Sequence, residues 1–577
     1  MTKRELRDFL PTSAKEMAAL GWDSADIILF TGDAYIDHPS FGAAIIGRVL
    51  QERGYRVAIV PQPNWRDDLR DFRKLGAPRL FFGVTSGAMD SMINHYTANK
   101  RIRSNDAYTP EGKAGQRPDY AVNVYTQILK SLYPEVPVII GGVEASLRRV
   151  THYDYWQDKL LPSVLISSGA DILVYGMGEK PILEIAAVLN SGASVLEVRN
   201  LRQIAFLAEW GDSGISDTVM LNSFEECCRD KMAFIENFNI LEREADSLHP
   251  KYLIEPAKGK FVHVTPSYPP VKEKELDSFY DLPFTKRPHP RYRDKHIPAY
   301  EMIKFSINTH RGCFGSCAFC TISAHQGKFV LSRSEDSILR EVKLLAAMEE
   351  FKGVISDAGG PTANMYGMGG RNPSLCTTCK RNSCVYPSVC KNLDISHERL
   401  LKLYKAISEV SGVKKLFIGS GIRYDLFLNE KGYLSVSGRE YLKEVIEKHT
   451  SGRFKVAPEH TEEHVLKLMG KPSFKSFRFL REEFKRISGN SRKRYEIMPY
   501  FISGHPGCTI ADMRSLASNP LLKDINTEQV QVFTPTPMTR SSIMYYTGLD
   551  TKTLKNIYIE RSIEDMKRQK SFFFNKK

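Results

Sequence analysis

The sequence has no long apolar run. None of its 577 residues belongs to a stretch approaching about 18 consecutive apolar residues, the length that a membrane-spanning helix needs. The N-terminal segment 1–30 contains basic residues but no continuous apolar core of the kind found in secretion signals. We therefore expect a cytoplasmic protein without a membrane partner.

Cysteine is scarce, and its distribution is uneven. Nine of the ten cysteines fall in three short groups, at 227–228, 313–320 and 376–390, and only Cys508 stands alone. Such tight groups favour metal binding in a reducing compartment over a framework of disulfides. The adjacent pair Cys227 and Cys228 is expected to be two ordinary buried thiols on a helix.

Positive charge is in excess. The chain carries 81 Lys and Arg residues against 67 Asp and Glu residues, which gives a formal net charge of +14. A basic surface attracts phosphate backbones, so an RNA substrate is compatible with this composition. The charge does not identify a partner, because the segment 551–577 alone holds eight basic and three acidic residues.

The N-terminal third alternates short apolar runs with helical patterns. The runs are bounded by Gly or Pro and lie at 25–32, 56–63, 79–87, 137–145 and 171–178. This alternation predicts an α/β domain with a doubly wound parallel sheet over 1–190. A helical segment over 191–265 and a Pro-rich linker over 266–301 are expected to follow.

A second alternating series occupies the rest of the chain. Its predicted strands lie at 302–308, 353–360, 414–422, 453–460, 495–504 and 528–535. Six β/α units predict a partial (β/α)6 barrel over 302–548, with a Cys-rich insertion at 371–394 and a basic tail at 549–577. Chemistry in such barrels lies at the carboxyl ends of the strands, and three cysteines directly follow the first strand.

The spacing Cys313-x3-Cys317-x2-Cys320 indicates a cubane 4Fe–4S cluster. Three thiolates hold three irons, and the fourth iron has no protein ligand. An open iron can bind the amino and carboxylate groups of S-adenosylmethionine and pass one electron to its sulfonium. Phe319 and the preceding strand favour this interpretation. The alternative is structural zinc, for which His325 is the candidate fourth ligand.

A second cysteine group has the spacing Cys376-x2-Cys379-x4-Cys384-x5-Cys390. Four thiolates within fifteen residues are enough for an all-cysteine zinc site or a fully ligated second iron–sulfur cluster, and both alternatives stay open. Because the two cysteine groups follow different strands, we expect them to take up metal independently.

Three segments carry a resemblance to a known family: "HPRYRDKHIPAYEMIKFSINTHRGCFGSCAFCTISAHQGK" (289–328), "EASLRRVTHYDYWQDKLLPS" (144–163) and "CKRNSCVYPSVC" (379–390). The chain resembles the radical S-adenosylmethionine superfamily and, within it, the uncharacterised YgiQ-type proteins. The resemblance implies an enzyme that cleaves S-adenosylmethionine with an electron from a donor such as flavodoxin or ferredoxin.

The resemblance extends to the Gly-Gly position of the superfamily. Gly359 and Gly360, in "SDAGGP", match the pair that binds the amino group of the methionine moiety. Pro361 stands where an acidic residue is common, so the contact is expected to involve backbone carbonyls. Glycine permits the close approach that such a contact requires.

Two further motifs resemble cofactor contacts. "GSGIRYDL" (419–426) resembles the motif near the ribose and the methionine carboxylate, with Ser420 and Arg423 as candidate contacts. "ISGHPGCT" (502–509) resembles the motif near the adenine, and its matching residues are Gly504, Pro506 and Gly507.

The N-terminal domain resembles cobalamin-binding domains. Those that use a lower axial histidine contain Asp-x-His-x-x-Gly, whereas this chain reads "DHPSFG" (37–42), with Asp37 and His38 adjacent. We therefore expect His38 to cap or line a loop, and we do not expect cobalamin.

The sequence thus predicts a radical S-adenosylmethionine enzyme that forms a 5′-deoxyadenosyl radical and acts on an unidentified substrate. One alternative is a radical methyltransferase or methylthiotransferase acting on RNA or protein. The other is a nucleic-acid-binding protein whose cysteines hold structural zinc. No residue is assigned to chemistry on the substrate.

Overall fold

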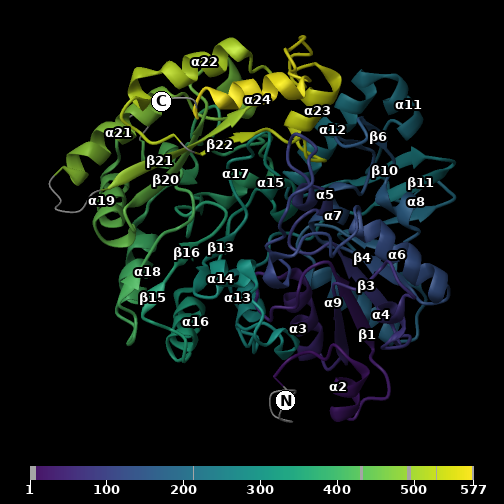
Figure 1. The fold of residues 1–577 in the computed structure, drawn as a ribbon. Coiled ribbons are helices and arrows are strands. Elements are labelled where there is room, and N and C mark those ends of the chain that lie inside the picture. Colours follow the sequence, from purple (N-terminus) through teal and green to yellow (C-terminus); the bar gives the residue numbers. More distant parts are fainter. Residues whose placement is uncertain (1–7, 212, 429–432, 490–494, 528, 575–577) are drawn as a thin grey trace. The chain divides into compact units, whose positions relative to one another are not determined.

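The computed structural model describes residues 8–211, 213–428, 433–489, 495–527 and 529–574 (Figure 1). The chain divides into two compact units, which we call the N-terminal unit and the barrel unit. The N-terminal unit comprises Met1–Ile240, His249–Pro269 and Ser278–Lys304, and the barrel unit comprises Leu241–Leu248, Pro270–Asp277 and Phe305–Lys577. The predicted linker 266–301 is therefore shared between the units, and it includes the helices α13 (Glu273–Tyr280) and α14 (Pro298–Ile303).

The N-terminal unit is built on a nine-stranded sheet with the order β2-β1-β3-β4-β7-β8-β11-β10-β9. Its first five strands are parallel and consist of β1 (Ile27–Thr31), β2 (Val57–Pro61), β3 (Phe81–Thr85), β4 (Val138–Ile140) and β7 (Ile172–Val174). These strands are almost wholly buried, as parallel strands covered on both faces are. The placement of β1 between β2 and β3 confirms the predicted doubly wound topology.

Helices occupy the connections of this sheet and cover its faces. They are α2 (Ala14–Ala19), α3 (Gly42–Glu52), α4 (Arg70–Arg73), α5 (Ser91–His95), α6 (Ala121–Leu132), α7 (Gly142–Leu147), α8 (Val164–Ser168) and α9 (Glu179–Asn190). A small hairpin of β5 (His152–Asp154) and β6 (Lys159–Leu161) stands apart from the large sheet.

The segment 191–265 is not a helical segment, and that prediction was wrong. It contains α10 (Val195–Val198), α11 (Phe224–Arg229) and α12 (Lys231–Ala245), but it also supplies β8 (Ile204–Ala208), β9 (Thr218–Met220), β10 (Tyr252–Ala257) and β11 (Lys260–Val264). Lys258 and Gly259 both have positive φ and join β10 to β11 in a tight hairpin. The pairing of β11 with β8 is remote in sequence, so no local pattern indicated it.

The barrel unit contains strands at all six predicted positions, although each is shorter than predicted. They are β12 (Ser306–Asn308), β15 and β16 (Val354–Ile355 and Asp357–Gly359), β19 (Lys415–Leu416), β20 (Arg453–Glu459), β21 (Glu496–Ser503) and β22 (Gln529–Val532). Every pairing between these strands is parallel and follows chain order, with a single bridge from Ile422 to Val456 joining the β19 region to β20. This confirms the predicted partial barrel.

Amphipathic helices cover the outside of these strands (Figure 1). They are α16 (Glu335–Ala346), α18 (Glu398–Ser408), α19 (Val436–Glu444), α20 (Glu463–Met469), α21 (Lys475–Ser488), α22 (Ile510–Ser518) and α23 (Arg540–Thr547). The apolar faces of all these helices except α23, together with the strand residues Ile307, Val456 and Phe501, form one continuous core. Among the residues described, no helix combines the length and hydropathy needed to span a bilayer.

The basic C-terminal segment 549–577 is more than a solvated tail. It contains α24 (Ile563–Ser571), whose side chains Met566 and Gln569 are buried, and Phe573 joins the barrel core. The spacing 566, 569, 573 places these residues on one helical face, while the basic Lys567 and Arg568 are exposed. The Cys-rich insertion 371–394 lies between β17 (Gly369–Gly370) and β18 (Leu393–Asp394), which pair with each other.

Candidate active site

The loop with the first three cysteines follows the first barrel strand. It begins at Gly312, where φ is +78° and an added Cβ would lie 2.1 Å from the carbonyl oxygen of Phe329. Only glycine fits this position. The Cys320 N–H donates to the carbonyl of Cys317 at 3.0 Å, and α15 (Ile322–Gln326) ends the loop. The three thiols therefore lie on one tight turn, as the sequence predicts.

The three thiols are partly buried and influence one another. Burial, together with negative charge on Cys317 and Cys313, raises the pKa of Cys320 to about 12. Burial also raises the pKa of Cys313, while the guanidinium of Arg423 lowers it. Three thiolates in one such site need cationic compensation, and soft thiolate ligands are those preferred by iron–sulfur clusters and zinc. The donor set therefore fits a cluster.

The zinc alternative at this loop has no geometric support. In the part of the chain that the structure describes, no three side chains of His, Cys, Asp or Glu are placed to share one metal ion. Cys313, Cys317, Cys320 and His325 are among the described residues and form no such group. A cubane does not require its thiolates to meet at one point, because each thiolate binds a different iron.

Gly359 and Gly360 end the second barrel strand close to this loop. A Cβ on Gly360 would lie 2.7 Å from two ring atoms of His310 and from its carbonyl oxygen. The carbonyl of Gly359 already accepts hydrogen bonds from the N–H (2.7 Å) and the hydroxyl (3.2 Å) of Thr309. The predicted backbone contact to the methionine amino group therefore falls to Gly360. Burial lowers the pKa of His310 to about 4, so its ring is neutral at pH 7.

Ser420 is held beside Gly359 by Asp357, a residue that the sequence analysis did not single out. The Asp357 carboxylate accepts from the N–H groups of Gly419 (2.9 Å) and Ser420 (3.2 Å), and also from the Ser420 hydroxyl. A Cβ on Gly359 would lie 3.3 Å from the Ser420 hydroxyl oxygen. The sequence did contain a signal for Asp357, because it is an acidic residue at the end of a barrel strand, two positions before Gly-Gly.

Arg423 lies against the cysteine loop. Its Nη1 is 3.6 Å from the sulfur of Cys317, while its Nε and Nη2 donate to Asp425 at 2.9–3.0 Å. The side-chain amide of Asn364 exchanges hydrogen bonds with the backbone of Arg423 at 2.8 and 3.0 Å. A Cβ on Gly315 would lie 2.4 Å from Nη1. Sequence reasoning found Arg423 but missed Asp425 and Asn364, which orient it.

The predicted adenine motif is buried, and its glycines are required by their surroundings. Gly504 and Gly507 have φ of +68° and +84°, and a Cβ on Gly507 would lie 2.3 Å from Leu468. Between them the ring of His505 meets Phe319 edge-to-face, with centroids 6.2 Å apart. The structure therefore brings Phe319 and the motif with Pro506 together.

Glu459 is a further polar residue that sequence reasoning missed. It ends β20 in a left-handed conformation (φ +66°), and its side chain is 10% exposed. Burial raises the pKa of its carboxyl, while the ammonium of Lys471, 3.7 Å away, lowers it. Its charge in turn acts on Cys320 and Arg423. A carboxyl at a strand end beside the cysteine loop is a candidate proton acceptor or donor.

The four cysteines of the second group lie on the insertion 371–394, and all four are partly buried. Burial and, to a smaller extent, negative charge on the other three cysteines raise the pKa of Cys384 to about 11. The Cys390 N–H donates to the carbonyl of Cys384 at 2.7 Å, and the Asn392 side chain donates to the sulfur of Cys376 at 3.4 Å. By contrast, Cys227 and Cys228 lie on α11, where Cys227 is buried as expected but Cys228 is exposed, so the prediction of two buried thiols was wrong for Cys228.

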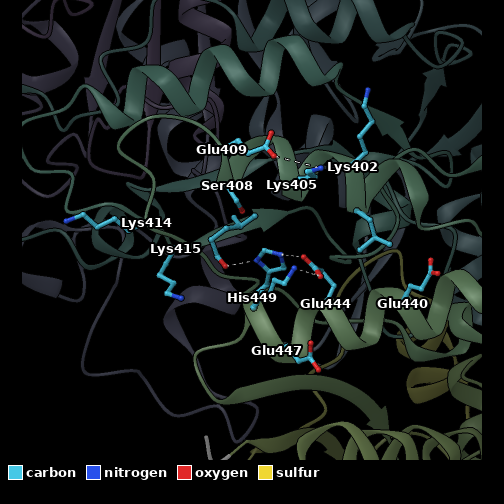
Figure 2. A pocket seen from close by; sticks show the side chains of 13 residues that line it. Lys402, Lys405, Ser408, Glu409, Lys414, Lys415, Glu440, Glu444, Glu447 and His449 are labelled. Carbon is cyan, nitrogen blue, oxygen red and sulfur yellow. Dashed lines mark hydrogen bonds and ion pairs between the residues drawn. The ribbon is translucent and has the colours of Figure 1, made fainter. Parts of the chain in front are cut away.

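A surface hollow of about 920 Å³ lies elsewhere on the barrel unit (Figure 2). Its lining includes Lys415, where β19 begins, so it lies at the opposite end of that strand from Ser420. The lysines and glutamates that line it form ion pairs, such as Lys448 with Glu444 at 3.0 Å. We assign no chemistry to this hollow.

The ligand crevice of the N-terminal sheet is filled by the chain itself. A doubly wound sheet binds ligands where strand order reverses, at the carboxyl ends of β1 and β3. Here the side chain of Arg117, which is fully buried, donates to Asp33 (2.9 Å), to Asp106 (3.2 Å) and to the carbonyl of Ser86 (2.8 Å). A Cβ on Gly32 would lie 2.2 Å from that same carbonyl oxygen. These residues do not fit a bulky ligand such as cobalamin.

The region expected for an axial histidine is likewise occupied by internal contacts. Asp37 accepts from Nε of Arg48 at 2.9 Å and from the N–H of Thr285 at 2.8 Å. Nδ1 of His38 accepts from the N–H of Ser40 at 3.1 Å, so His38 caps its own loop as predicted.

The fold and the three-cysteine loop define the class of protein, and comparison with known proteins agrees. Residues 9–306 match the family described as Radical SAM N-terminal. A UPF0313 protein of Porphyromonas gingivalis is 54% identical over 573 residues, covering 99% of this chain and 90% of that protein. The UPF0313 protein YgiQ of Escherichia coli is 43% identical over 595 residues, covering 94% and 79%. The chain belongs to the UPF0313, or YgiQ-type, family of radical S-adenosylmethionine proteins.

A solved structure shares the fold. It is the radical S-adenosylmethionine methyltransferase TsrM from Kitasatospora setae, described with cobalamin and a [4Fe-4S] cluster bound. The TM-score is 0.50 and the identity 13%, and the match covers 90% of this chain and 78% of TsrM.

Proposed function

We propose that this protein is an enzyme that cleaves S-adenosylmethionine reductively and uses the product radical on a substrate still to be identified. The observation that carries the proposal is the loop Cys313–Cys320 at the end of the first barrel strand, with the guanidinium of Arg423 beside it. A 4Fe–4S cluster on Cys313, Cys317 and Cys320 would supply one electron to the sulfonium, whose carbon–sulfur bond then breaks to give methionine and a 5′-deoxyadenosyl radical.

The remaining site residues would bind and orient the S-adenosylmethionine. Arg423 supplies a fixed positive charge for the methionine carboxylate, because Asp425 and Asn364 leave its guanidinium little freedom. The backbone carbonyl of Gly360 is the proposed acceptor for the amino group, and the lack of a side chain at Gly360 lets His310 pack against it. Holding both groups before electron transfer lowers the entropic part of the barrier.

The ribose and adenine of S-adenosylmethionine would lie near the motifs 419–426 and 502–509. Ser420 retains hydroxyl lone pairs for the ribose while it donates to Asp357. Phe319 and the segment Gly504–Gly507 form an apolar, tightly packed surface suited to the adenine. We further propose a cytoplasmic location and an electron donor of the flavodoxin or ferredoxin type. Transfer of methyl or methylthio groups to RNA or protein is suggested by the basic composition and by the N-terminal domain, but no residue of the site is assigned to it, and it is not adopted.

Anaerobic preparation tests this function. We expect about four irons and four sulfides at the first loop and slow release of 5′-deoxyadenosine from S-adenosylmethionine with dithionite. Cys317→Ala should lose both the cluster and the cleavage, whereas Cys228→Ala, a cysteine exposed on α11, should retain both. A fully loaded protein that neither binds nor cleaves S-adenosylmethionine would contradict the proposal.

We also propose that the N-terminal unit does not hold cobalamin in the crevice filled by Arg117. The ion pairs of Arg117 with Asp33 and Asp106 would have to open to admit it, and breaking a buried charge cluster costs about 3–5 kcal/mol. After equilibrium dialysis against hydroxocobalamin, each chain should therefore retain less than about 0.1 equivalent of cobalamin. Retention of one equivalent by the wild-type protein would overturn this part of the proposal.

A further inference from the structure

The N-terminal unit contains a buried arginine that lacks a carboxylate partner. Arg149 is 5% exposed, and no carboxylate among the described residues forms an ion pair with it. Its Nη1 donates to the carbonyl of Ser146 at 2.8 Å, whereas Nε is buried without a hydrogen-bond partner and Nη2 likewise has none in the described part of the chain. Buried charges are normally paired, so this guanidinium needs an anion from outside the fold.

The preceding arginine is paired within the fold. Arg148 forms an ion pair with Asp90, and the two side chains are each 4% exposed. Burial lowers the pKa of Arg148, but the carboxylates of Asp90 and Glu144 raise it by more. For Arg149, burial lowers the pKa and no carboxylate offsets the effect. The two neighbouring arginines therefore differ in charge compensation, and only Arg149 has room for an external anion.

Arg149 lies against the loop 175–178, which follows β7 at the carboxyl edge of the sheet. Its guanidinium carbon is 4.9 Å from the centroid of the Tyr175 ring, and Tyr175 is the first residue after β7. Ser146 joins the arginine to the loop, because its carbonyl accepts from Arg149 and its hydroxyl accepts from the N–H of Gly176 at 3.0 Å. Ligands of α/β sheets bind outside the carboxyl ends of the strands, which is where Arg149 lies.

This loop offers hydrogen-bond donors and uses its acceptors internally. The side-chain amide of Gln203 donates to the carbonyls of Tyr175 and Met177 at 2.9 and 2.7 Å. The N–H groups of Met177, Gly178 and Lys180 have no hydrogen-bond partner among the residues described. Gly178 precedes α9, a helix of 12 residues without a side-chain cap, and such an N-terminus favours an anion.

Further positive charge surrounds the loop. Lys180, in the first turn of α9, is half-buried and forms no ion pair with any described residue. Burial raises the pKa of Tyr175 to about 12 against the opposing effect of Arg149 and Arg202, so both cations lie close to its ring. The carboxylate of Glu179, the first residue of α9, has no comparable effect on Arg149.

We propose that Arg149 anchors a binding site for the terminal phosphate group of a small ligand at the carboxyl end of β7. The Nε–Nη2 edge of the guanidinium donates two parallel hydrogen bonds to the phosphate, and the N–H groups of the loop 175–178 donate to its remaining oxygens. A terminal phosphate reaches a buried guanidinium, whereas the backbone of a polymer does not. The site uses no residue of the barrel unit, so it is independent of S-adenosylmethionine cleavage.

Calorimetric titration of the full-length protein with inorganic phosphate, at constant ionic strength, is the first test. Wild type should bind phosphate at least about tenfold more tightly than acetate, because acetate has too few oxygens to reach both the guanidinium and the loop. Arg149→Met should weaken phosphate binding at least about tenfold.

Arg199→Met is the matched control and should retain the wild-type affinity. Arg199 also lies over an aromatic ring, 5.1 Å from the centroid of Phe206, but the charge of Asp171, at the amino end of β7, acts on it. Equal affinity for phosphate and acetate in wild type would overturn the proposal. Equal phosphate affinity in Arg149→Met and Arg199→Met would overturn it as well.

Thermal unfolding in phosphate-free buffer distinguishes a binding role of Arg149 from a structural one. Arg149→Met leaves no carboxylate unpaired, so its melting temperature should equal or exceed that of wild type. Arg148→Met leaves Asp90 buried without its partner and should melt several degrees lower. Added phosphate should raise the melting temperature of wild type but not that of Arg149→Met. A decrease in Arg149→Met as large as that in Arg148→Met would show that Arg149 is structural and would overturn the site.

Discussion

At the scale of single residues, the site depends on charges and glycines whose neighbours fix their roles. The side chain of Arg423 is 7% exposed and forms a buried pair with Asp425, yet its third nitrogen faces the cysteine loop. Gly315, Gly359 and Gly360 leave the space that Arg423, Ser420 and His310 occupy. Each glycine is therefore explained by a specific side chain remote in sequence.

Arg423→Ala should weaken S-adenosylmethionine binding at least about tenfold, since a charged hydrogen bond contributes about 1.5–3 kcal/mol. Iron should stay bound. The free energy of unfolding of the variant should also fall by about 3–5 kcal/mol, because Asp425 is left buried without a partner. Calorimetry and thermal unfolding measure the two effects. The double variant Arg423→Met with Asp425→Leu should recover stability but not binding, and recovery of both would show that Arg423 acts only structurally.

Gly360→Ala should displace the end of β16, because the new Cβ would lie 2.7 Å from the backbone oxygen of His310 as well as from its ring. We expect at least about a tenfold loss in affinity for S-adenosylmethionine with iron content retained. Gly369→Ala is the control, since nothing lies within 4 Å of a Cβ built there. Titration of both variants by calorimetry decides the question, and equal affinities would remove Gly360 from the binding site.

At the scale of elements, α24 completes the barrel behind the adenine motif. The side-chain oxygen of Gln569 accepts from the N–H of Gly504 at 2.8 Å, and Gly507 donates to the carbonyl of Tyr558 at 2.7 Å. The C-terminal segment thus satisfies buried backbone groups of a motif about sixty residues earlier in the chain.

Gln569→Ala should leave the Gly504 N–H buried without an acceptor, which costs about 1–3 kcal/mol. The melting temperature should fall by a few degrees, and hydrogen exchange should rise in peptides covering 502–509. Lys567→Ala, on the exposed side of the same helix, should change neither quantity. Identical exchange in the two variants would mean that α24 does not support the motif.

At the scale of the whole molecule, buried titratable groups determine how stability responds to pH. In the described part of the chain, burial lowers the pKa of eight histidines. The pKa falls to about 3 for His152 and His460 and to about 4 for His289, His310, His397 and His505, and it is also lowered for His263 and His449. Five carboxyls act in the opposite direction, because burial raises the pKa of Asp33 to about 6, of Asp246 to about 7 and of Glu255 to about 8, and it also raises the pKa of Glu144 and Glu459.

The protein should lose stability as the pH falls from about 6.5 towards about 4. Unfolded histidines have a pKa of about 6.5 and take up protons in this range, whereas the folded ones do not. Protonation of the buried carboxyls stabilises the folded protein over the same pH range, but the carboxyls are fewer than the histidines, so the histidines dominate. Each uncompensated group changes the free energy of unfolding by up to about 1.4 kcal/mol per pH unit.

Thermal unfolding between pH 7.5 and 5 measures this response. His460→Gln should reduce the dependence of the melting temperature on pH, whereas His464→Gln should not, because the side chain of His464 is 58% exposed. A melting temperature that rises steadily on acidification to pH 5 would show that the carboxyls prevail.

The sequence by itself determined the fold class, the grouping of the cysteines and the strand-end motifs. Apolar runs of period two and helical patterns are local, and a three-cysteine spacing is readable without knowing what lies opposite it. The same local reasoning failed for β8 to β11, whose pairing joins residues up to about sixty positions apart, and for α24, whose apolar face is short and surrounded by basic residues.

Only the tertiary structure decided how these parts act on one another. Asp357 and Asn364 gain their roles from partners about sixty residues away, so no spacing identified them. Glu459 pairs with Lys471 beyond the next helix. Asp425 was within reach of local reasoning, because its partner Arg423 is two residues away. The filling of the N-terminal crevice by Arg117 depends on a side chain from a distant insertion reaching Asp33. The hydrogen bond from the Ser383 hydroxyl to the Phe314 carbonyl likewise joins loops 69 residues apart. Hydrogen bonds and close packing of this kind depend on three-dimensional proximity, which a linear pattern does not contain.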